Sequence, residues 1–153
     1  MKIAVALGSN LGDREGHLRG ATAALAPLLT GLRVSSFRET APVGVVTAQP
    51  LFLNAAAIGN SDLDAHTLLR RLLSIEAAFG RERPYPNAPR SLDIDLILYG
   101  DAIIETPHLT VPHPRFRERR FVLEPLSEIA ADWIDQVTGR SIAELLSALR
   151  HAP

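Results

Sequence analysis

The segment 92–99 constrains the fold more than any other part of the sequence. It reads Leu-Asp-Ile-Asp-Leu-Ile-Leu-Tyr, and this aliphatic run with acids at alternate positions predicts a β-strand. Because successive side chains on a strand point to opposite faces, Asp93 and Asp95 are expected to leave the same face. The side chains expected to point together into a core are those of Leu92, Ile94, Leu96 and Leu98.

Strand and helix patterns alternate along the rest of the chain. Alternating or β-branched runs predict strands at residues 3–7, 32–39 and 52–58. Helical spacing and capping residues predict helices from Asp13 to about Leu29, from Asp64 or Ser61 to Gly80, and from Ser141 to Arg150. The order strand, helix, strand, strand, helix, strand predicts an α+β fold of the ferredoxin-like type, a sandwich in which helices pack on the faces of a mainly antiparallel sheet.

Glycine and proline mark the irregular segments. Residues 80–90 are charged and rich in proline, which predicts a long loop of the kind that often carries function. The predictions beyond residue 99 are a hairpin turn at Gly100-Asp101 into residues 102–105, a loop at 107–114, and a mostly helical stretch at 115–130 with a break at Pro125.

Length, charge and cysteine content exclude several classes of protein. The 153 residues suit one domain, taken as 1–153. The chain has 16 Lys plus Arg against 17 Asp plus Glu. It therefore has no net positive charge that would attract nucleic acid as a partner. No segment approaches the roughly 20 apolar residues of a membrane span. The absence of cysteine agrees with a reducing compartment, and we expect a cytoplasmic protein.

Asp93 and Asp95 are candidate metal ligands. Two carboxylates side by side at the start of a core strand repel each other unless a cation lies between them. Oxygen ligands favour magnesium, which usually binds through one or two carboxylates and nucleotide phosphates. The alternative is a solvated strand face, which is common in antiparallel sheets and remains open for an isolated Asp-x-Asp.

Arginines flank the two aspartates along the chain. The arginines before and after them are Arg81, Arg83 and Arg90, and then Arg115, Arg117, Arg119 and Arg120. A guanidinium group matches phosphate oxygens, and phosphoryl transfer needs mainly positioning and charge neutralisation from the protein. Acids for a metal and arginines for phosphates together predict an MgATP site. Alternatively, the second group of arginines is a solvated helical face.

Three further side chains suggest a pocket for a flat heterocycle. Phe52 and Phe121 offer aromatic faces and Asn54 offers an amide, although two core phenylalanines and a turn residue would give the same pattern. His113 is open to interpretation as a phosphate donor, a metal ligand or a packed loop residue. Gly8-Ser9-Asn10 is not part of a Walker or Rossmann motif, so those nucleotide-binding folds are excluded.

Several motifs occur together in a fixed order. They are Gly8-Ser9-Asn10-Leu11-Gly12-Asp13, Thr40-Ala41-Pro42-Val43-Gly44, Phe52-Leu53-Asn54-Ala55, Ile75-Glu76 with Gly80-Arg81, Pro89-Arg90-Ser91-Leu92-Asp93-Ile94-Asp95, and Leu109-Thr110-Val111-Pro112-His113-Pro114. With these motifs the chain resembles the 6-hydroxymethyl-7,8-dihydropterin pyrophosphokinase family over essentially its whole length. The resemblance implies a ferredoxin-like fold, a monomer, and transfer of pyrophosphate from ATP to the pterin hydroxymethyl group, with release of AMP, in folate biosynthesis.

The same resemblance implies a role for each matching residue. Two Mg²⁺ ions bound with ATP would lie on Asp93 and Asp95, and Arg81 and Arg90 would complete the catalytic set. The nucleotide would be bound by Glu76, Arg83, Arg90, Thr110, His113 and Arg119. The pterin would be bound by Thr40, Pro42, Val43, Phe52, Asn54 and Phe121.

The chain departs from the family pattern at three places, none of which involves the aspartates. Asn87-Ala88 stand where many relatives have Trp-Gly, Pro114 stands where an aromatic residue is common, and Ala41 stands where proline is frequent. The competing functions are a metal-dependent phosphohydrolase and a non-catalytic ferredoxin-like module that binds a ligand.

Overall fold

A computed structural model describes residues 1–40, 51–79 and 91–150. Its strands are β1 (Lys2–Ser9), β2 (Thr30–Val34), β3 (Arg38–Thr40), β4 (Phe52–Asn60), β5 (Asp93–Tyr99), β6 (Ile104–Glu105) and β7 (Thr110–Val111). Its helices are α1 (Arg14–Leu25), α2 (Ala65–Ala78), α3 (Arg120–Ala130) and α4 (Ile142–Arg150), with a short 3-10 helix η1 (Phe116–Glu118).

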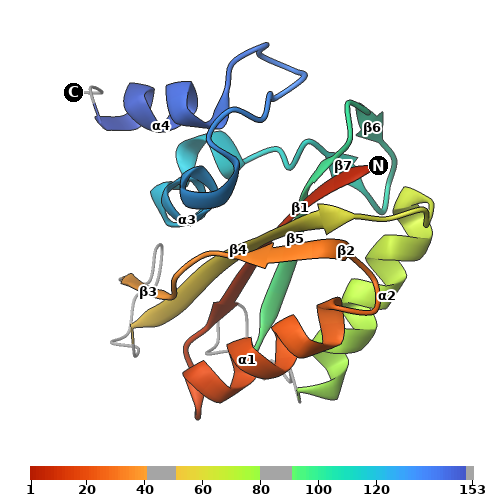
Figure 1. Cartoon of the computed structure of the whole chain (residues 1–153), viewed down its shortest axis with the longest axis vertical. Coiled ribbons are helices and arrows are strands. Elements are labelled where there is room, and N and C mark those ends of the chain that lie inside the picture. Colours follow the sequence, from red (N-terminus) through yellow and green to blue (C-terminus); the bar gives the residue numbers. More distant parts are fainter. Residues whose placement is uncertain (41–50, 80–90, 151–153) are drawn as a thin grey trace.

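The main sheet is antiparallel and has β1 at its centre (Figure 1). The strand order is β2-β4-β1-β5, and β3 also pairs with β4. The first strand therefore lies between the two strands that flank α2, which is the split β-α-β arrangement. The predicted ferredoxin-like α+β fold is confirmed.

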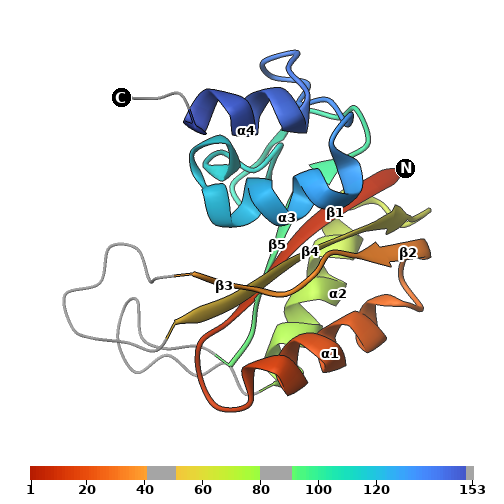
Figure 2. The ribbon, with the colours of Figure 1, turned by 60° about the vertical axis from the view of Figure 1, so that its left-hand side comes forward.

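A helical layer covers each face of the sheet, so the protein has two apolar cores. In Figure 2, α1 and α2 lie beneath the sheet and α3 and α4 lie above it. Side chains that point down from the sheet, such as Val5 and Leu7, pack with the first pair of helices. Side chains that point up, such as Ala4 and Ala6, pack with the second pair. Because successive side chains of β1 point to opposite faces of the sheet, this one strand contributes to both cores.

The predicted helix starts are confirmed at their capping residues. Asp13, Asp64 and Ser141 each accept a side-chain hydrogen bond from the backbone N–H three residues further on. These bonds satisfy donors that have no partner within the helix. The first helix ends at Leu25, earlier than expected, because Pro27 lacks the N–H that would continue it.

The prediction that Leu98 shares a core with Leu92, Ile94 and Leu96 is wrong. The register against β1 shifts by one residue at Ile97, which is the extra residue of a β-bulge. Ile97 and Leu98 therefore face α3 and α4, whereas Leu96 faces α1 and α2. Asp93 and Asp95 precede the bulge and keep the shared face that alternation predicts.

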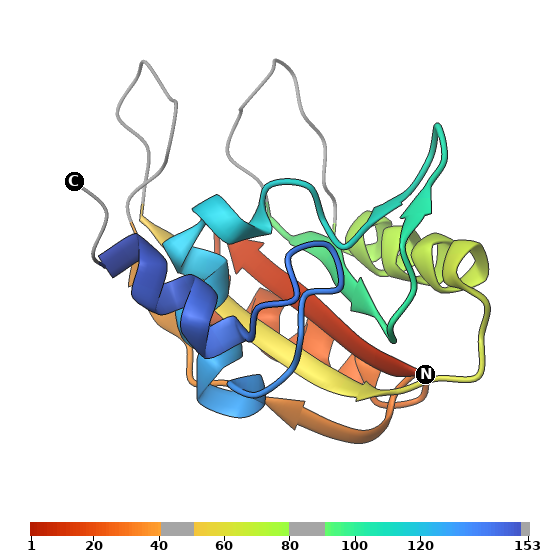
Figure 3. The same ribbon diagram turned by 90° about the horizontal axis from the view of Figure 1, so that it is seen from above.

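The predicted hairpin between residues 92–99 and 102–105 is also wrong. Strand β6 pairs instead with β7, in a region predicted to be a loop, and Figure 3 shows this pair apart from the main sheet. Gly100 has a φ of 56° and donates a hydrogen bond to the Lys2 carbonyl at 2.6 Å, which turns the chain toward β1. The Ile97 carbonyl of β5 accepts a hydrogen bond from His113 N instead.

Two smaller predictions fail for local reasons. The strand expected at 32–39 is divided into β2 and β3, because the Ser35 hydroxyl accepts the hydrogen bond from Ala56 N that a regular ladder gives to a carbonyl. Pro125 does not break the helix at 115–130 but lies inside α3, with its ring buried. Burial of the ring offsets the hydrogen bond that proline cannot donate. Within the described ranges, no helix has the length and apolar character that crossing a bilayer requires.

Candidate active site

The end of β1 and the starts of β4 and β5 meet at one end of the sheet (Figure 1). Gly8 of β1 pairs with Asn54 on one side and with Asp93 on the other. Residues paired in this way point to the same face, so Asn54 and Asp93 lie about 10 Å apart, two strand spacings. A Cβ atom on Gly8 would lie 3.0 Å from Asn54 Oδ1. Asn54, Gly8 and Asp93 therefore form a row across three strands, with a polar side chain at each end and none in the middle. We call this row the floor of the site.

The two aspartates lie on the face that α3 and α4 cover. Asp95 pairs with Ala6, which belongs to the core beneath those helices. The Asp95 side chain is 36% exposed. On the side of β5 away from β1, Glu76 Oε2 accepts a hydrogen bond from Ile94 N at 2.7 Å, and Glu76 itself is 3% exposed. This buried carboxylate fixes the backbone between Asp93 and Asp95.

Arg119 lies between the acidic strand and an aromatic ring. It is the N-cap residue of α3, and its Nη1 lies 4.0 Å from Asp95 Oδ2. Its Cζ lies 5.6 Å from the centre of the Phe121 ring. An ion pair at that distance is loose, so the guanidinium can turn toward a phosphate without losing a strong contact.

His113 is half-buried beside β5 and is neutral at pH 7. Burial, followed by the positive charges of Arg119 and Arg115, lowers the pKa of His113 to about 4, against the opposing effect of Asp93. His113 Nδ1 accepts a hydrogen bond from Arg115 N at 3.2 Å. The proton of the neutral ring is therefore assigned to Nε2, which can donate to an anionic oxygen.

The predicted pterin contacts that the structure describes lie beyond Gly8, on β3, β4 and α3. Asn54 is 5% exposed, and its Nδ2 donates a hydrogen bond to Thr40 Oγ1. Thr40 pairs with Phe52 across the two strands. Helix α3 packs over β4 and carries Phe121 to the same side of the sheet as Phe52. In the described part of the chain, these two rings do not stack on each other. Their faces are therefore not covered by mutual stacking.

Among the described residues, the predicted nucleotide contact Thr110 is not part of this arrangement. Thr110 is exposed on β7 and pairs with Glu105. The predictions for Pro42, Val43, Arg81, Arg83 and Arg90 lie outside the described residues.

Two features of the site were not predicted. Gly8 was noted only as part of the Gly8-Ser9-Asn10 motif, and its position between Asn54 and Asp93 depends on strand pairing. Arg38 pairs with Asn54 across β3 and β4, and its guanidinium contacts Glu124 at 3.3 Å and Glu128 at 3.1 Å on α3. These ion pairs tie the helix that carries Phe121 to the sheet. Sequence spacing gives no signal for either feature.

The candidate metal ligands remain Asp93 and Asp95. Among the described residues, no cluster of three or more His, Cys, Asp or Glu side chains is placed to hold an ion. A zinc site of the structural type is thus not formed by this part of the chain. A cation that takes its other ligands from water and substrate phosphates remains compatible with the pair.

Comparison with known proteins gives consistent matches. The family model described as 7,8-dihydro-6-hydroxymethylpterin-pyrophosphokinase matches residues 4–131. The 2-amino-4-hydroxy-6-hydroxymethyldihydropteridine pyrophosphokinase of Synechocystis is 43% identical over 145 residues, which cover 93% of this chain and 73% of that protein. The mitochondrial folate synthesis bifunctional protein of Arabidopsis thaliana is 41% identical over 141 residues, 90% of this chain and 25% of that protein.

A solved structure has the same fold at low sequence identity. The crystal structure of wild-type Plasmodium falciparum HPPK-DHPS with pteroate superposes with a TM-score of 0.74 at 13% identity. The match covers 95% of this chain and 42% of that chain, so this chain spans less than half of that protein.

Proposed function

Because this chain belongs to the 7,8-dihydro-6-hydroxymethylpterin-pyrophosphokinase family, we propose that it transfers a pyrophosphoryl group from ATP to the hydroxymethyl group of 6-hydroxymethyl-7,8-dihydropterin. The products are AMP and the pterin diphosphate, and the reaction belongs to folate synthesis. The observation that carries the proposal is the floor of the site. An amide with aromatic neighbours and a pair of carboxylates lie on one sheet face, with Gly8 between them.

The aspartates fit magnesium by the chemistry of their donors. Asp93 and Asp95 present hard oxygen atoms from one face of β5, and the Asp95 carboxylate is accessible at 36% exposure. Magnesium binds through one or two carboxylates and completes its shell with water and phosphate oxygens. We therefore assign the two Mg²⁺ ions that accompany ATP to these carboxylates. When bound, the ions neutralise the phosphate charge and orient the transferred group.

The nucleotide side of the site would use the segment that leads into α3. Arg119 and neutral His113 lie next to the aspartates and supply N–H donors to phosphate oxygens. A neutral imidazole that donates through Nε2 adds a hydrogen bond without a charge that the surrounding arginines would repel. Glu76 supports the site from behind, since it fixes the backbone of β5 through Ile94. Arg81 and Arg90 are expected to bind the phosphates, as the family resemblance implies.

The pterin side would use the amide and the aromatic rings. Because Asn54 Nδ2 is committed to Thr40, the Oδ1 atom is the acceptor left for the N–H groups of the heterocycle. Phe52 and Phe121 offer apolar faces to a flat ring. This binding mode places the hydroxymethyl group toward Asp93. Its oxygen attacks the β-phosphorus, the bond to the α-phosphate oxygen breaks, AMP leaves, and the hydroxyl proton passes to solvent.

The test is AMP release with and without 6-hydroxymethyl-7,8-dihydropterin, in the presence of ATP and Mg²⁺. The proposal requires AMP only when the pterin is present, and loss of AMP release when Mg²⁺ is removed with a chelator. ADP, or phosphate released without the pterin, would instead indicate a kinase or a phosphohydrolase. The cytoplasmic location, the monomeric state and the single domain at 1–153 stay predictions.

A further inference from the structure

The turn after β1 was singled out as a motif, yet only Gly8 has been given a part in the site. Gly12 has a φ of 69°, a conformation that glycine adopts without strain. Its carbonyl accepts a hydrogen bond from Arg14 N at 3.0 Å, and Asp13 caps α1. The turn therefore fixes the direction in which Arg14, the first residue of α1, leaves the helix.

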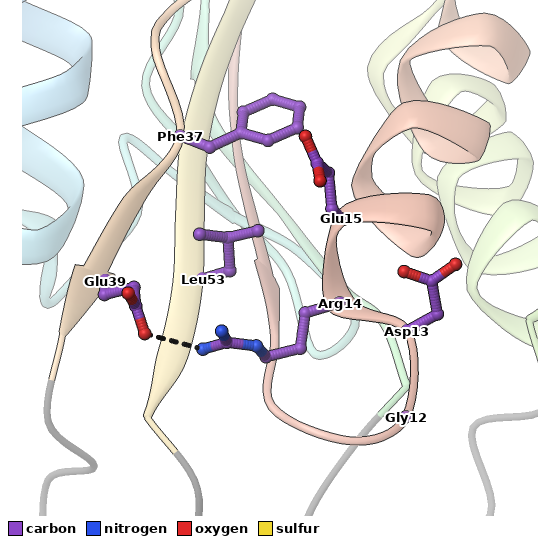
Figure 4. Close-up of a pocket in the computed structure, with 7 residues that line it drawn as sticks. All are labelled: Gly12, Asp13, Arg14, Glu15, Phe37, Glu39 and Leu53. Carbon is purple, nitrogen blue, oxygen red and sulfur yellow. Dashed lines mark hydrogen bonds and ion pairs between the residues drawn. The ribbon is translucent and has the colours of Figure 1, made fainter.

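The Arg14 guanidinium contacts both strand β3 and the residue that precedes β4. Its Nη1 lies 3.2 Å from Glu39 Oε2 on β3 (Figure 4). The same atom donates a hydrogen bond to the Leu51 carbonyl at 2.8 Å. Glu39 immediately precedes Thr40, and Leu51 immediately precedes Phe52. Thr40 and Phe52 are paired across β3 and β4. The Arg14 side chain thus contacts the residue that precedes each member of this pair, through the Glu39 carboxylate and the Leu51 carbonyl.

Arg14 makes these contacts from the face opposite the candidate site. Its neighbours on β4 and before β3 are Leu53 and Phe37, and they line a cavity of about 480 Å³ with the start of α1. Leu53 and Phe37 pack against the core of α1 and α2. By alternation along β4, Phe52 and Asn54 point the other way, toward α3. An effect of Arg14 on a ligand of those residues must therefore pass through the backbone.

We propose that Arg14 is a positioning residue for the pterin half of the site. It fixes the start of β4 against the end of β3, and so sets where Thr40, Phe52 and Asn54 stand. The aspartates lie on β5, on the other side of β1, so the Arg14 contacts do not position them. The inference rests on the proposed function, because it assumes that these three side chains bind the pterin.

The size of the effect follows from the nature of the contacts. The Arg14 side chain is 29% exposed and that of Glu39 is 55% exposed, so their ion pair is largely screened by solvent. The bond to the Leu51 carbonyl adds one charged hydrogen bond to the tether. We expect loss of both to raise the KM for the pterin roughly tenfold, the equivalent of ~1.4 kcal/mol of binding.

The experiment compares Arg14→Met with Arg19→Met in steady-state kinetics of AMP release. Methionine keeps an apolar stem and removes both polar contacts. Arg19 is a matched control on the same helix, since it forms an ion pair with Glu15 and both side chains are well exposed, at 71% and 59%. Arg14→Met should raise the KM for the pterin about tenfold, while the KM for ATP and kcat change by less than about twofold. Arg19→Met should change none of the three.

Glu39→Ala is a second variant that decides the matter if Arg14→Met fails to fold. It should raise the KM for the pterin by less than Arg14→Met does, because the bond to Leu51 remains. The double variant Arg14→Met/Glu39→Ala should match Arg14→Met, since both changes remove one tether. An unchanged KM for the pterin, or an equal rise in the KM for ATP, would overturn the inference. Wild-type protein that makes no AMP would refute the proposed function instead.

Discussion

Asp135 anchors the segment that carries His113 and Arg119, and its removal should destabilise the fold. Its side chain is fully buried. The carboxylate accepts hydrogen bonds from Arg117 Nε at 2.5 Å and Nη2 at 2.8 Å, in a bidentate pair. Thr138 Oγ1 and Val137 N donate to it as well, at 2.6 Å and 3.2 Å. A single carboxylate thus connects η1 to the loop before α4.

The loss of folding stability in Asp135→Ala can be estimated from the polar groups that the substitution leaves without a partner. Removing one partner of a buried ion pair costs about 3–5 kcal/mol. Arg117 keeps 21% of its side-chain surface in water, which favours the low end, ~3 kcal/mol. For a chain of this length, ~3 kcal/mol corresponds to a fall in Tm of roughly 6–12 °C.

The loss should depend on pH in a defined direction. Burial alone would raise the pKa of Asp135, but hydrogen bonds from Arg117, Thr138 and Val137 hold it below the usual 3.8. A group with a lowered pKa in the folded state stabilises the fold above its unfolded pKa, and this stabilisation is lost as the pH falls through the folded value. The difference between wild type and Asp135→Ala should therefore be complete at pH 7 and shrink below about pH 4.

The assay is urea or thermal unfolding of wild type, Asp135→Ala and the control Asp132→Ala, whose side chain is exposed. A second readout is the KM for ATP, which should rise in Asp135→Ala because η1 holds Arg119 in place, while the KM for the pterin stays unchanged. A Tm within about 2 °C of wild type would refute the assigned role of the ion pair.

Three further changes test individual parts of the site. Asp95→Ala should reduce turnover at least about 100-fold with an unchanged Tm, because the carboxylate faces the ligand; a fully active variant would remove it from the site. Gly8→Ala should raise the KM for the pterin roughly tenfold, since the new Cβ crowds Asn54 Oδ1 at 3.0 Å, and an unchanged KM would count against the proposed floor. The His113 ring should stay neutral down to about pH 4 when titrated by NMR, and stability should fall between pH 6.5 and 4 because only the unfolded state binds that proton. Titration near 6.5 would contradict this.

The sequence predicted the elements whose signals are local. Caps at Asp13, Asp64 and Ser141 are short-range hydrogen bonds, so their positions follow from residue type and spacing. The start of β5 was also predictable, because alternation before the bulge depends only on neighbouring residues. The element order then limited the topology to a small set.

The failures arose where a distant partner decides the outcome. The bulge at Ile97 depends on its register with β1, and the end of β5 depends on a bond from Gly100 to Lys2. Pro125 stays helical because its ring is buried. The same reason applies to the site. The aspartate pair could be predicted from a single strand. The roles of Arg14 and Asp135 could not, because they depend on contacts with residues far along the chain.

The central claim is that the β- and γ-phosphates of ATP move together onto the pterin. The most direct measurement follows ATP labelled with ³²P at the γ-position, and in a parallel reaction at the α-position, with 6-hydroxymethyl-7,8-dihydropterin and Mg²⁺. We expect γ-label in the pterin diphosphate and α-label in AMP, in equal amounts. Release of γ-label as phosphate or pyrophosphate, or recovery of α-label as ADP, would contradict that claim.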